Sequence, residues 1–350
     1  MMNKQPDMKE ARFYNKLNDN KIQCTLCSHE CIIRTSKRGT CGVRENHDGV
    51  LFALNYGKLV AQHIDPIEKK PLFHFYPGSK SYSISTVGCN FRCTFCQNHD
   101  ISQMPARTSK IIGKYVSPED VVEQAVKYDC KSISYTYTEP TIYFEYALDV
   151  AKIAHKQNIK NVFVTNGYFS LEALREIVPY LDAANVDLKS YSEDFYIKLC
   201  GSKLSPVLDT IKLLKECGIW IEVTTLIIPT KNDSDEELHS IAEYITRIDE
   251  NIPWHISAFY PTYKLLNIPP TPTKTLLHAF EIGIKTGLHY VYTGNIYNKN
   301  TETTFCSKCK KPLIERYFYD VINRIDVNAD CPYCGNSVAG VGLVPPELLH

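Results

Sequence analysis

The sequence has no excess of charge and no long apolar segment. Its 39 Lys and Arg residues balance 39 Asp and Glu residues, so nothing attracts the chain to nucleic-acid phosphates or to an anionic membrane. The opening MMNKQPDMKEARFYNKLNDN is polar and lacks the apolar core of a signal peptide. No apolar run reaches the roughly 20 residues of a transmembrane helix. These absences predict a cytoplasmic protein that binds neither nucleic acid nor membrane.

Cysteine, by contrast, is abundant, with 14 residues in a chain of 350. In a reducing compartment, closely spaced cysteines indicate metal sites rather than disulfides. Three cysteines stand apart and are interpreted as small buried apolar residues: Cys130, Cys200 and Cys217. The others form three groups: Cys24, Cys27, Cys31 and Cys41; Cys89, Cys93 and Cys96; Cys306, Cys309, Cys331 and Cys334.

These groups divide the chain into three predicted domains. A Cys-rich head spans residues 1–80, a regular central region spans 81–300, and a tail with two Cys-x2-Cys pairs spans 301–350. Short β-like runs alternate with helical patterns in the centre, at 81–86, 132–137, 161–165, 184–188, 219–228 and 254–260. This alternation predicts an α/β fold whose parallel strands are joined by right-handed crossovers.

The helical patterns have recognisable ends. Ser117 is a predicted N-cap before Pro118, and Ser205 begins a second pattern in the same way. Gly218 and Gly287 are predicted C-terminal stops. Length and periodicity fit either an open doubly wound sheet or a partial barrel, so they do not separate these two folds.

Polar residues gather where four of the predicted strands end. In β/α barrels the chemistry lies at the carboxyl ends of the strands, so this placement favours a partial (β/α)6 TIM-like barrel with these residues at one mouth. In strand order they are Cys89, Cys93 and Cys96; Thr138 and Glu139; Thr165, Asn166 and Gly167; Asp187 and Lys189.

The segment GCNFRCTFCQN places Cys89, Cys93 and Cys96 in a Cys-x3-Cys-x2-Cys pattern without a fourth cysteine nearby. Zinc sites usually have four protein ligands, so a zinc site here would need His99 as the fourth. Three thiolates can instead hold three irons of a four-iron cluster and leave the fourth iron open. The barrel context favours the cluster, because a zinc knuckle needs no strand–helix array behind it.

This pattern, with Phe95 before the last cysteine, resembles the signature of the radical SAM superfamily. The resemblance implies a [4Fe–4S] cluster whose open iron binds S-adenosylmethionine (SAM), and an external one-electron reductant such as flavodoxin or ferredoxin. It further implies that reduction cleaves SAM to methionine and a 5′-deoxyadenosyl radical, which abstracts hydrogen from a substrate. Phe95 is then expected to lie at the cofactor.

Three further segments resemble SAM-contacting parts of that superfamily. YTYTEPT implies that Glu139 accepts the SAM amino group, the alternative being that Glu-Pro only opens the next helix. FVTNGY implies that Thr165 and Asn166 contact the ribose, and otherwise forms a plain Asn-Gly turn. NVDLK resembles the Asp-x-Lys segment of glycyl-radical-enzyme activating enzymes, while Asp187 and Lys189 equally fit a buried ion pair.

The most extensive resemblance is to the AmmeMemoRadiSam-system radical SAM enzymes, a group related to the activating enzymes. It rests on CTLCSHECIIRTSKRGTCGVREN, DPIEKKPLFHFYPG, TVGCNFRCTFCQNHDISQ, YTYTEPT, FVTNGY, NVDLKS, EVTTLIIP and PPTPTKTL, which span nearly the whole chain. Two positions depart from the activating enzymes: Val164 replaces an acid that helps to hold a monovalent cation, and Tyr260 replaces a His at the end of the last strand.

The other two cysteine groups each supply four thiolates. The paired spacing in the tail predicts a closed structural zinc site like that of a zinc ribbon. The head group fits zinc or an auxiliary [4Fe–4S] cluster, and zinc is the preferred interpretation. Histidines near these cysteines are interpreted as surface or packing residues: His29, His47, His63 and His74.

Three functions stay open on the sequence alone. The first is a radical SAM enzyme that modifies a small molecule or peptide, and the second is an activating enzyme that generates a glycyl radical on a partner protein. The third is a non-catalytic interaction protein with zinc at all three cysteine groups. The departures at Val164 and Tyr260 incline the prediction toward the first, with the substrate and the catalytic residues unidentified.

Overall fold

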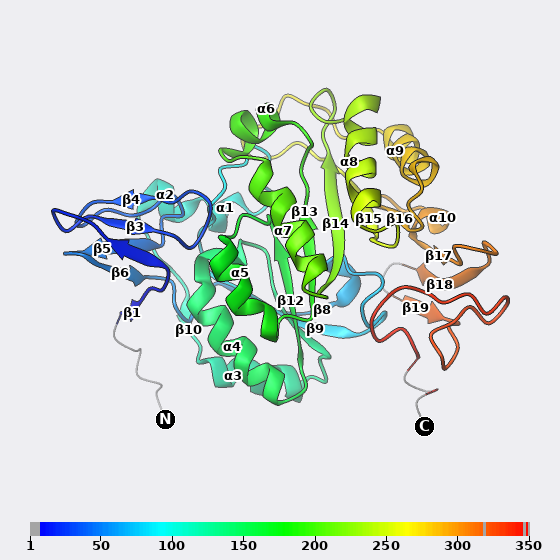
Figure 1. Cartoon of the computed structure of the whole chain (residues 1–350), viewed down its shortest axis with the longest axis horizontal. Coiled ribbons are helices and arrows are strands. Elements are labelled where there is room, and N and C mark those ends of the chain that lie inside the picture. Colours follow the sequence, from blue (N-terminus) through cyan, green and yellow to red (C-terminus); the bar gives the residue numbers. More distant parts are fainter. Residues whose placement is uncertain (1–7, 318–319, 346–347, 349–350) are drawn as a thin grey trace. The chain divides into compact units, whose positions relative to one another are not determined.

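The computed structural model describes residues 8–317, 320–345 and 348. The extreme ends of the predicted head and tail domains therefore lie outside the described residues. By its internal contacts the chain divides into two compact units (Figure 1). The first comprises residues 1–65, 80–184 and 196–219, and the second comprises 66–79, 185–195 and 220–350.

The first unit contains strands in the order β12-β11-β9-β8, with bounds Lys160–Thr165, Ser132–Tyr135, Lys80–Ser85 and Ala61–Pro66. Strands β9, β11 and β12 are parallel, with Ser132 opposite both Ser81 and Lys160. The longer helices are α3 (Pro118–Lys127), α4 (Phe144–Lys156), α5 (Leu171–Ile177) and α7 (Ser205–Glu216). Short elements are α1 (His99–Ser102), α2 (Met104–Thr108), the 3₁₀ turns η2 (Pro140–Tyr143) and η3 (Val178–Tyr180), and the π-helical turn η4 (Tyr196–Cys200).

The ends of these helices follow from local chemistry. Ser117 caps α3 by accepting a hydrogen bond from the backbone of Asp120, whose side chain in turn accepts one from the Ser117 backbone. Helix α7 begins at Ser205 with a proline in its first turn, and Gly218 follows its end with a φ of +77°. The expectation that Ser205 caps this helix as Ser117 caps α3 was wrong, because the N-cap is Leu204 and no side chain caps the helix. The signals at Ser117 and Gly218 are therefore confirmed as a helix start and a helix stop.

Before β8, the Cys-rich head has strands that are only two to four residues long. They pair as β1-β6-β5 (Lys9–Glu10, Val50–Ala53, Arg44–His47), β2-β3-β4 (Tyr14–Lys16, Ile22–Cys24, Ile32–Ile33) and β10-β7 (Lys114–Tyr115, Lys58–Leu59). A buried ion pair connects the head to α4, with Arg44 Nη2 lying 2.5 and 2.6 Å from the two carboxylate oxygens of Glu145. Both side chains are only 1% exposed.

The second unit contains parallel strands in the order β16-β15-β14 (Val291–Gly294, Trp254–Ala258, Trp220–Ile227). Helices α8 (Asp235–Ile248) and α9 (Thr273–Thr286) pack together, and Gly287 ends α9 with a φ of +108° as predicted. Shorter helices are η1 (Ile67–Lys69), α6 (Glu193–Phe195) and α10 (Lys299–Glu302), and the tail forms the sheet β17-β18-β19 (Thr304–Phe305, Pro312–Tyr317, Asp320–Asn323). Strand β13 (Ala183–Asp187) spans the sequence boundary between the units. All six predicted strands are present, and the mixed α/β fold with parallel strands is confirmed.

A buried polar network lies near the amino ends of β14, β15 and β16. The Glu222 carboxylate accepts hydrogen bonds from the backbone of Phe73 (2.9 Å) and His74 (2.8 Å), and its Oε2 lies 2.6 Å from His255 Nε2. His74 Nε2 in turn lies 2.6 Å from the hydroxyl of Tyr292. In β/α folds, residues at this end of the strands serve stability, so the network anchors the segment 66–79 within its unit.

The stability of the second unit is expected to depend on pH through His74. Burial lowers the pKa of His74 from 6.5 to about 4. Between these values the unfolded chain binds a proton that the folded protein does not bind, so the free energy of unfolding should fall by roughly 3 kcal/mol as the pH drops from 6.5 to 4. Urea unfolding at a series of pH values measures this slope. The variant His74→Gln should show a shallower slope, whereas equal slopes would contradict this assignment.

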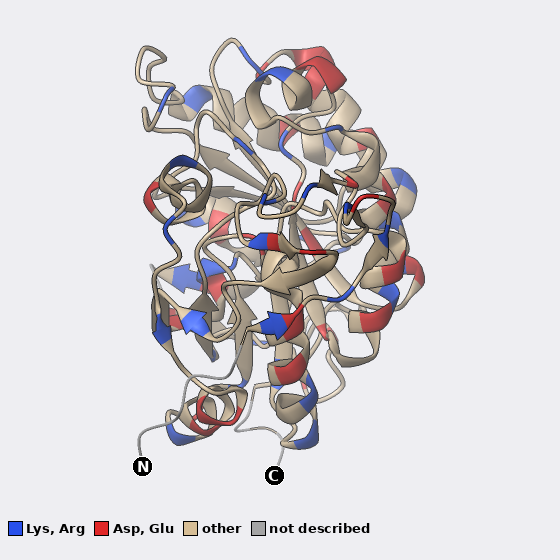
Figure 2. Ribbon diagram, turned by 90° about the vertical axis from the view of Figure 1, so that its left-hand side faces the viewer, with Lys and Arg blue, Asp and Glu red and all other residues tan. Residues whose placement is uncertain are grey.

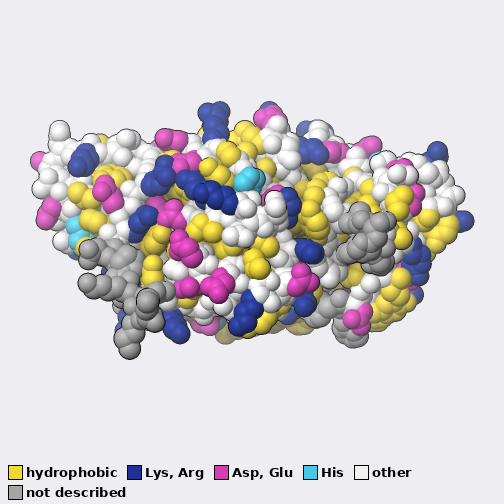
Figure 3. All heavy atoms as spheres, turned by 90° about the horizontal axis from the view of Figure 1, so that it is seen from below, with side chains coloured by type: hydrophobic (Ala, Val, Ile, Leu, Met, Phe, Trp, Pro, Cys, Tyr) yellow, Lys and Arg dark blue, Asp and Glu magenta, His cyan; other side chains and the backbone are white. Residues whose placement is uncertain are grey.

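Charges of both signs are interspersed over the protein. Figure 2 shows acidic and basic residues mixed along the ribbon, and Figure 3 shows both kinds of side chain among apolar ones on the face that it displays. No helix within the described residues is long and apolar enough to cross a membrane. The balance of acidic and basic residues in the sequence is thus also visible in the views of these two figures.

Candidate active site

The loop that carries Cys89, Cys93 and Cys96 follows β9 in the first unit. The π-helical turn η4 holds this loop, because the carbonyl of Cys200 accepts a hydrogen bond from Arg92 N (2.7 Å) and that of Leu199 accepts one from Thr94 N (2.9 Å). These bonds fix the backbone on both sides of Cys93. π-Helical turns are rare and frequently lie at functional sites, and nothing in the sequence around Tyr196 signalled this one.

Gly88, directly before Cys89, allows the head to pack against the loop. Its φ is +104°, and a Cβ atom there would lie 2.7 Å from Val43 Cγ1 and 3.1 Å from the carbonyl oxygen of Cys41. Both the backbone conformation and the close approach therefore require glycine. The backbone of Cys41 in the head group thus lies close to the residue directly before Cys89.

The three thiols are placed among hydrogen-bond donors. The Cys89 sulfur accepts from Phe91 N at 3.3 Å, and the Cys96 sulfur lies 3.2 Å from the Ser102 hydroxyl. Burial, followed by the nearby Glu139 carboxylate and Cys93, raises the pKa of Cys89 well above its ordinary value. A bound metal cation would offset the cost of burying the Cys89 thiolate, since metal ligation deprotonates a thiol.

Asn90 adds an unused donor beside these thiols. Its amide nitrogen is buried and has no hydrogen-bond partner among the described residues. The Asn90 amide oxygen accepts from Asn166 Nδ2 at 2.8 Å. Because an unpaired buried donor is costly, this nitrogen suits a group with acceptor atoms, such as an iron–sulfur cluster or the carboxylate of SAM. The donor set of the loop therefore fits the cluster that the three-cysteine pattern implies.

Glu139 is the buried acid next to this loop, with 3% of its surface exposed. Its Oε1 accepts from Thr141 N (3.1 Å), Thr141 Oγ1 (2.6 Å) and Thr165 Oγ1 (2.7 Å), and its Oε2 accepts from Asn166 N (2.7 Å). Burial raises the pKa of Glu139, although hydrogen bonds from Asn166, Thr141 and Thr165 oppose that rise. A cationic ligand against Oε2 would be favoured by the same burial. Glu139 also caps η2, so the helix-opening role considered from the sequence is present too.

Thr165 and Asn166, at the end of β12, are both engaged within the protein. The Thr165 hydroxyl donates to Glu139 and accepts from Gly167 N (3.0 Å), while Asn166 Nδ2 reaches Asn90 and lies 3.8 Å from the Cys89 sulfur. One hydrogen-bond network thus joins Cys89, Asn166 and Glu139. Phe95 is also buried, with 4% of its surface exposed.

Asp187 ends β13 and Lys189 lies two residues beyond it, both in the second unit, and they form an ion pair of 2.8 Å between Lys189 Nζ and Asp187 Oδ2. The Asp187 side chain is 36% exposed and that of Lys189 is 15% exposed. Asn232 Nδ2 donates to the backbone carbonyl of Lys189 at 2.8 Å and fixes the chain there. The ion-pair alternative from the sequence is therefore observed in a half-buried form.

The tail cysteines converge on one point, as a single metal ion requires. Cys306, Cys309, Cys331 and Cys334 have sulfur atoms within 4.8 Å of one another. The pairs Cys306–Cys334 and Cys309–Cys331 are each 3.7 Å apart, about the edge length of a tetrahedron of thiolates around one ion at 2.3 Å. These thiols form the only group of three or more candidate ligands brought that close within the described part of the chain.

The head cysteines do not form such a tight group, since only the tail thiols come within 4.8 Å of one another in the described part of the chain. Burial raises the pKa of Cys27, as do its neighbours Cys24, Cys41 and Cys31. Burial also raises the pKa of Cys41 to about 11, against a lowering by Arg44. Thr40 lies beside Cys31, with its N at 3.4 Å and its Oγ1 at 3.3 Å from the sulfur.

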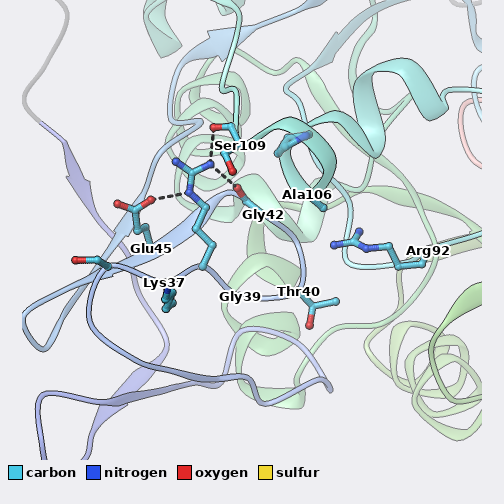
Figure 4. A pocket seen from close by; sticks show the side chains of 11 residues that line it. Lys37, Gly39, Thr40, Gly42, Glu45, Arg92, Ala106 and Ser109 are labelled. Carbon is cyan, nitrogen blue, oxygen red and sulfur yellow. Dashed lines mark hydrogen bonds and ion pairs between the residues drawn. The ribbon is translucent and has the colours of Figure 1, made fainter.

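A basic pocket of about 650 Å³ lies between the head and α2. Lys37, Thr40 and Arg92 are among its lining residues, and Figure 4 shows Glu45 and Arg92 on opposite sides of it. The dashed lines in Figure 4 include the bond from Arg38 Nε to Glu45 Oε2 at 2.6 Å. The pocket adjoins both thiol groups, since Thr40 contacts Cys31 and Arg92 precedes Cys93.

Three thiols on one loop after a parallel strand, beside a buried carboxylate, are an arrangement that suits an iron–sulfur cluster. A family model described as the radical SAM superfamily matches residues 83–245. The chain belongs to the radical SAM superfamily, and it is a radical SAM enzyme. The superfamily implies SAM and a [4Fe–4S] cluster as cofactors, which excludes the interpretation that all three cysteine groups serve a non-catalytic zinc protein.

Similar proteins match further parts of the chain. The protein named "Uncharacterized protein MJ0808" of Methanocaldococcus jannaschii is 46% identical over 334 residues, which cover 95% of this chain and 99% of that protein. A putative glycyl-radical enzyme activating enzyme of the same organism, MJ1632, is 26% identical over 59% of this chain and 78% of its own length. The crystal structure of Streptococcus suis SuiB bound to S-adenosylmethionine shares the fold, with a TM-score of 0.51 and 14% identity over 69% of this chain and 56% of that chain.

Proposed function

We propose that this radical SAM enzyme binds SAM between the loop of Cys89, Cys93 and Cys96 and the carboxylate of Glu139. The network that joins Cys89, Asn166 and Glu139 carries this proposal. Cys89, Cys93 and Cys96 each bind one iron, and Glu139 Oε2 pairs with the SAM ammonium. When bound, the cluster and SAM supply the 5′-deoxyadenosyl radical.

The remaining predicted contacts orient the cofactor. Phe95 shields the cluster from water, and Thr165 and Asn166 position the strand end that meets the ribose. Asp187 and Lys189 offer a charge pair to the SAM carboxylate or to a nearby cation. A partial (β/α)6 barrel with the Cys-rich head of residues 1–80 and the tail of residues 301–350 is the architecture that fits these roles best.

We further propose that the hydrogen donor is a polypeptide. The support is the relationship to proteins named glycyl-radical enzyme activating enzyme and pyruvate formate-lyase-activating enzyme. Val164 and Tyr260 differ from the activating enzymes, which favours a different polypeptide from that of pyruvate formate-lyase activation.

Deuterium transfer tests the substrate class. Extract from cells grown in deuterated medium is separated by ultrafiltration into macromolecular and small-molecule fractions, and each is incubated anaerobically with the enzyme, SAM and dithionite. Mass spectrometry of 5′-deoxyadenosine should detect deuterium with the macromolecular fraction and not with the other. Deuterium from the small-molecule fraction alone would contradict a polypeptide substrate.

The tail is proposed to hold one structural zinc ion, because its thiols meet at tetrahedral spacing. Such a site is closed and stabilises the small sheet β17-β18-β19 around it. We also propose a cytoplasmic location, since grouped free thiols and an oxygen-sensitive cluster need a reducing compartment.

An acidic one-electron donor, such as flavodoxin or ferredoxin, is proposed to dock at the basic pocket. Replacing the exposed Lys37 with Glu should slow reduction by flavodoxin several-fold at low salt, because steering by charge is lost. Stopped-flow measurement of cluster reduction gives this rate. Lys156→Glu, on the exposed face of α4, is the matched control. In this variant flavodoxin should reduce the cluster at the wild-type rate. Equal rates for Lys37→Glu and Lys156→Glu would contradict docking at the pocket.

A further inference from the structure

The head and tail cysteine groups differ in the spacing of their thiols. The tail thiols lie at the short distances of ligands around one ion, with two pairs 3.7 Å apart. Cys24, Cys27, Cys31 and Cys41 influence one another electrostatically, yet among the described residues only the tail group comes within 4.8 Å. In a four-iron cluster each thiolate binds a different iron at a corner of a cube, so its thiolates stand farther apart than around one zinc ion. Neither the head group nor the loop of Cys89, Cys93 and Cys96 has the short thiol spacing of the tail among the described residues.

The head also provides the donors and the charge that a buried iron–sulfur cluster needs. Thr40 offers its backbone N–H and its hydroxyl to the Cys31 sulfur. The buried guanidinium of Arg44 lies close enough to Cys24 and Cys41 to act on both electrostatically. Donors and cations around the sulfur atoms stabilise the reduced form of a cluster.

Two contacts place the head directly against the residues that flank Cys89. The carbonyl of Cys41 packs on Gly88, where a Cβ would lie 3.1 Å from it. His29, in the turn between Cys27 and Cys31, has its Nε2 2.8 Å from the carbonyl oxygen of Asn90. From the sequence alone, His29 was interpreted as a surface or packing residue without an identified partner.

Further contacts hold the same turn of the head in place. Ser28 Oγ donates to the carbonyl of Phe169 at 3.0 Å. The His29 ring contacts Tyr168 at a centroid distance of 4.9 Å, and Tyr168 contacts Phe91 of the cluster loop at 5.2 Å. Aromatic contacts and a hydrogen bond to the backbone thus connect this turn of the head to the cluster loop.

We infer that Cys24, Cys27, Cys31 and Cys41 hold an auxiliary four-iron cluster that delivers electrons to the SAM cluster, an inference that rests on the proposed function. A low-potential protein donor gives up one electron, which reduces the head cluster. The electron then moves through the Cys41–Gly88 and His29–Asn90 contacts to the cluster at Cys89, Cys93 and Cys96. The head cluster is left oxidised again, and no bond or proton is exchanged in the transfer.

Metal analysis of two full-length variants tests the metal. After anaerobic reconstitution, the triple variant Cys89→Ala/Cys93→Ala/Cys96→Ala should retain about four irons per chain and about one zinc. The double variant Cys27→Ala/Cys31→Ala should also retain about four irons, with an electron paramagnetic resonance (EPR) signal that changes on addition of SAM. A triple variant without iron and with about two zinc ions would overturn the inference. The tail zinc reports in each case that the chain has folded.

The EPR spectrum of the reduced wild-type protein tests the electron path. Two reduced clusters joined by the contacts above should interact magnetically, so the wild-type signal should be broader than the sum of the signals from the two variants. A spectrum equal to that sum would overturn the proposed relay. If SAM leaves the EPR signal of the double variant unchanged while the triple variant retains its iron, the result contradicts the proposed function and supports the head cluster.

Discussion

Replacing Cys96 with Ala is expected to abolish the reductive cleavage of SAM. The loop offers three thiolates for a four-iron cluster, so the loss of one leaves too few ligands to hold it. The neighbouring Ser102 hydroxyl, 3.2 Å from the Cys96 sulfur, is a poor iron ligand and should not compensate. Anaerobic incubation with SAM and dithionite, followed by chromatography of 5′-deoxyadenosine, measures the effect. No product above the level without protein is the expected result.

Cys217→Ala is the matched control for this variant. Cys217 lies at the end of α7 and belongs to none of the three groups. It is exposed, so the prediction that it is buried like Cys130 and Cys200 was wrong. Its replacement should leave both iron content and product yield unchanged. Formation of 5′-deoxyadenosine by Cys96→Ala at the rate of Cys217→Ala would contradict the role of the loop.

Replacing Arg44 with Met is expected to lower the free energy of unfolding by about 3–5 kcal/mol, the usual effect of leaving one member of a buried ion pair without its partner. Arg44 Nη2 contacts both oxygens of Glu145, and both side chains are 1% exposed. Arg44 Nη1 also donates to the carbonyl of Arg12 at 3.0 Å. Anaerobic urea unfolding followed by circular dichroism measures this change.

The double variant Arg44→Met/Glu145→Leu separates charge from packing. Replacing a whole buried pair with apolar residues is often close to neutral, so this variant should recover much of the lost stability. A single variant Arg44→Met with nearly wild-type stability would contradict the cost assigned to the unpaired charge. Equal losses in the single and double variants would assign the effect to packing.

The sequence predicted the repeating part of the fold because its signals are local. Short β-like runs located all six central strands, the N-cap Ser117 began α3, and Gly287 ended α9 as expected. The strand β16 was missed, since VYTG is too short to show a period. The head strands before β8, of two to four residues, likewise carry no periodic pattern.

The candidate site was predictable in its residues and not in its contacts. Cys89, Glu139 and Asn166 were identified by motif, yet their hydrogen-bond network joins positions up to 77 residues apart. The carbonyls of η4 that hold the cysteine loop, and the bond between His29 and Asn90, have no signature in the chain. Such partners depend on tertiary packing, so only the folded protein shows them.

The open iron is the central claim, and one spectroscopic measurement addresses it directly. The reduced protein is mixed with SAM labelled with ¹⁵N in its amino group, and electron–nuclear double resonance is recorded on the cluster signal. A ¹⁵N coupling to the cluster, absent without SAM, is the predicted result, because the three thiolates leave one iron for the amino group. An unchanged spectrum without nitrogen coupling would contradict the account.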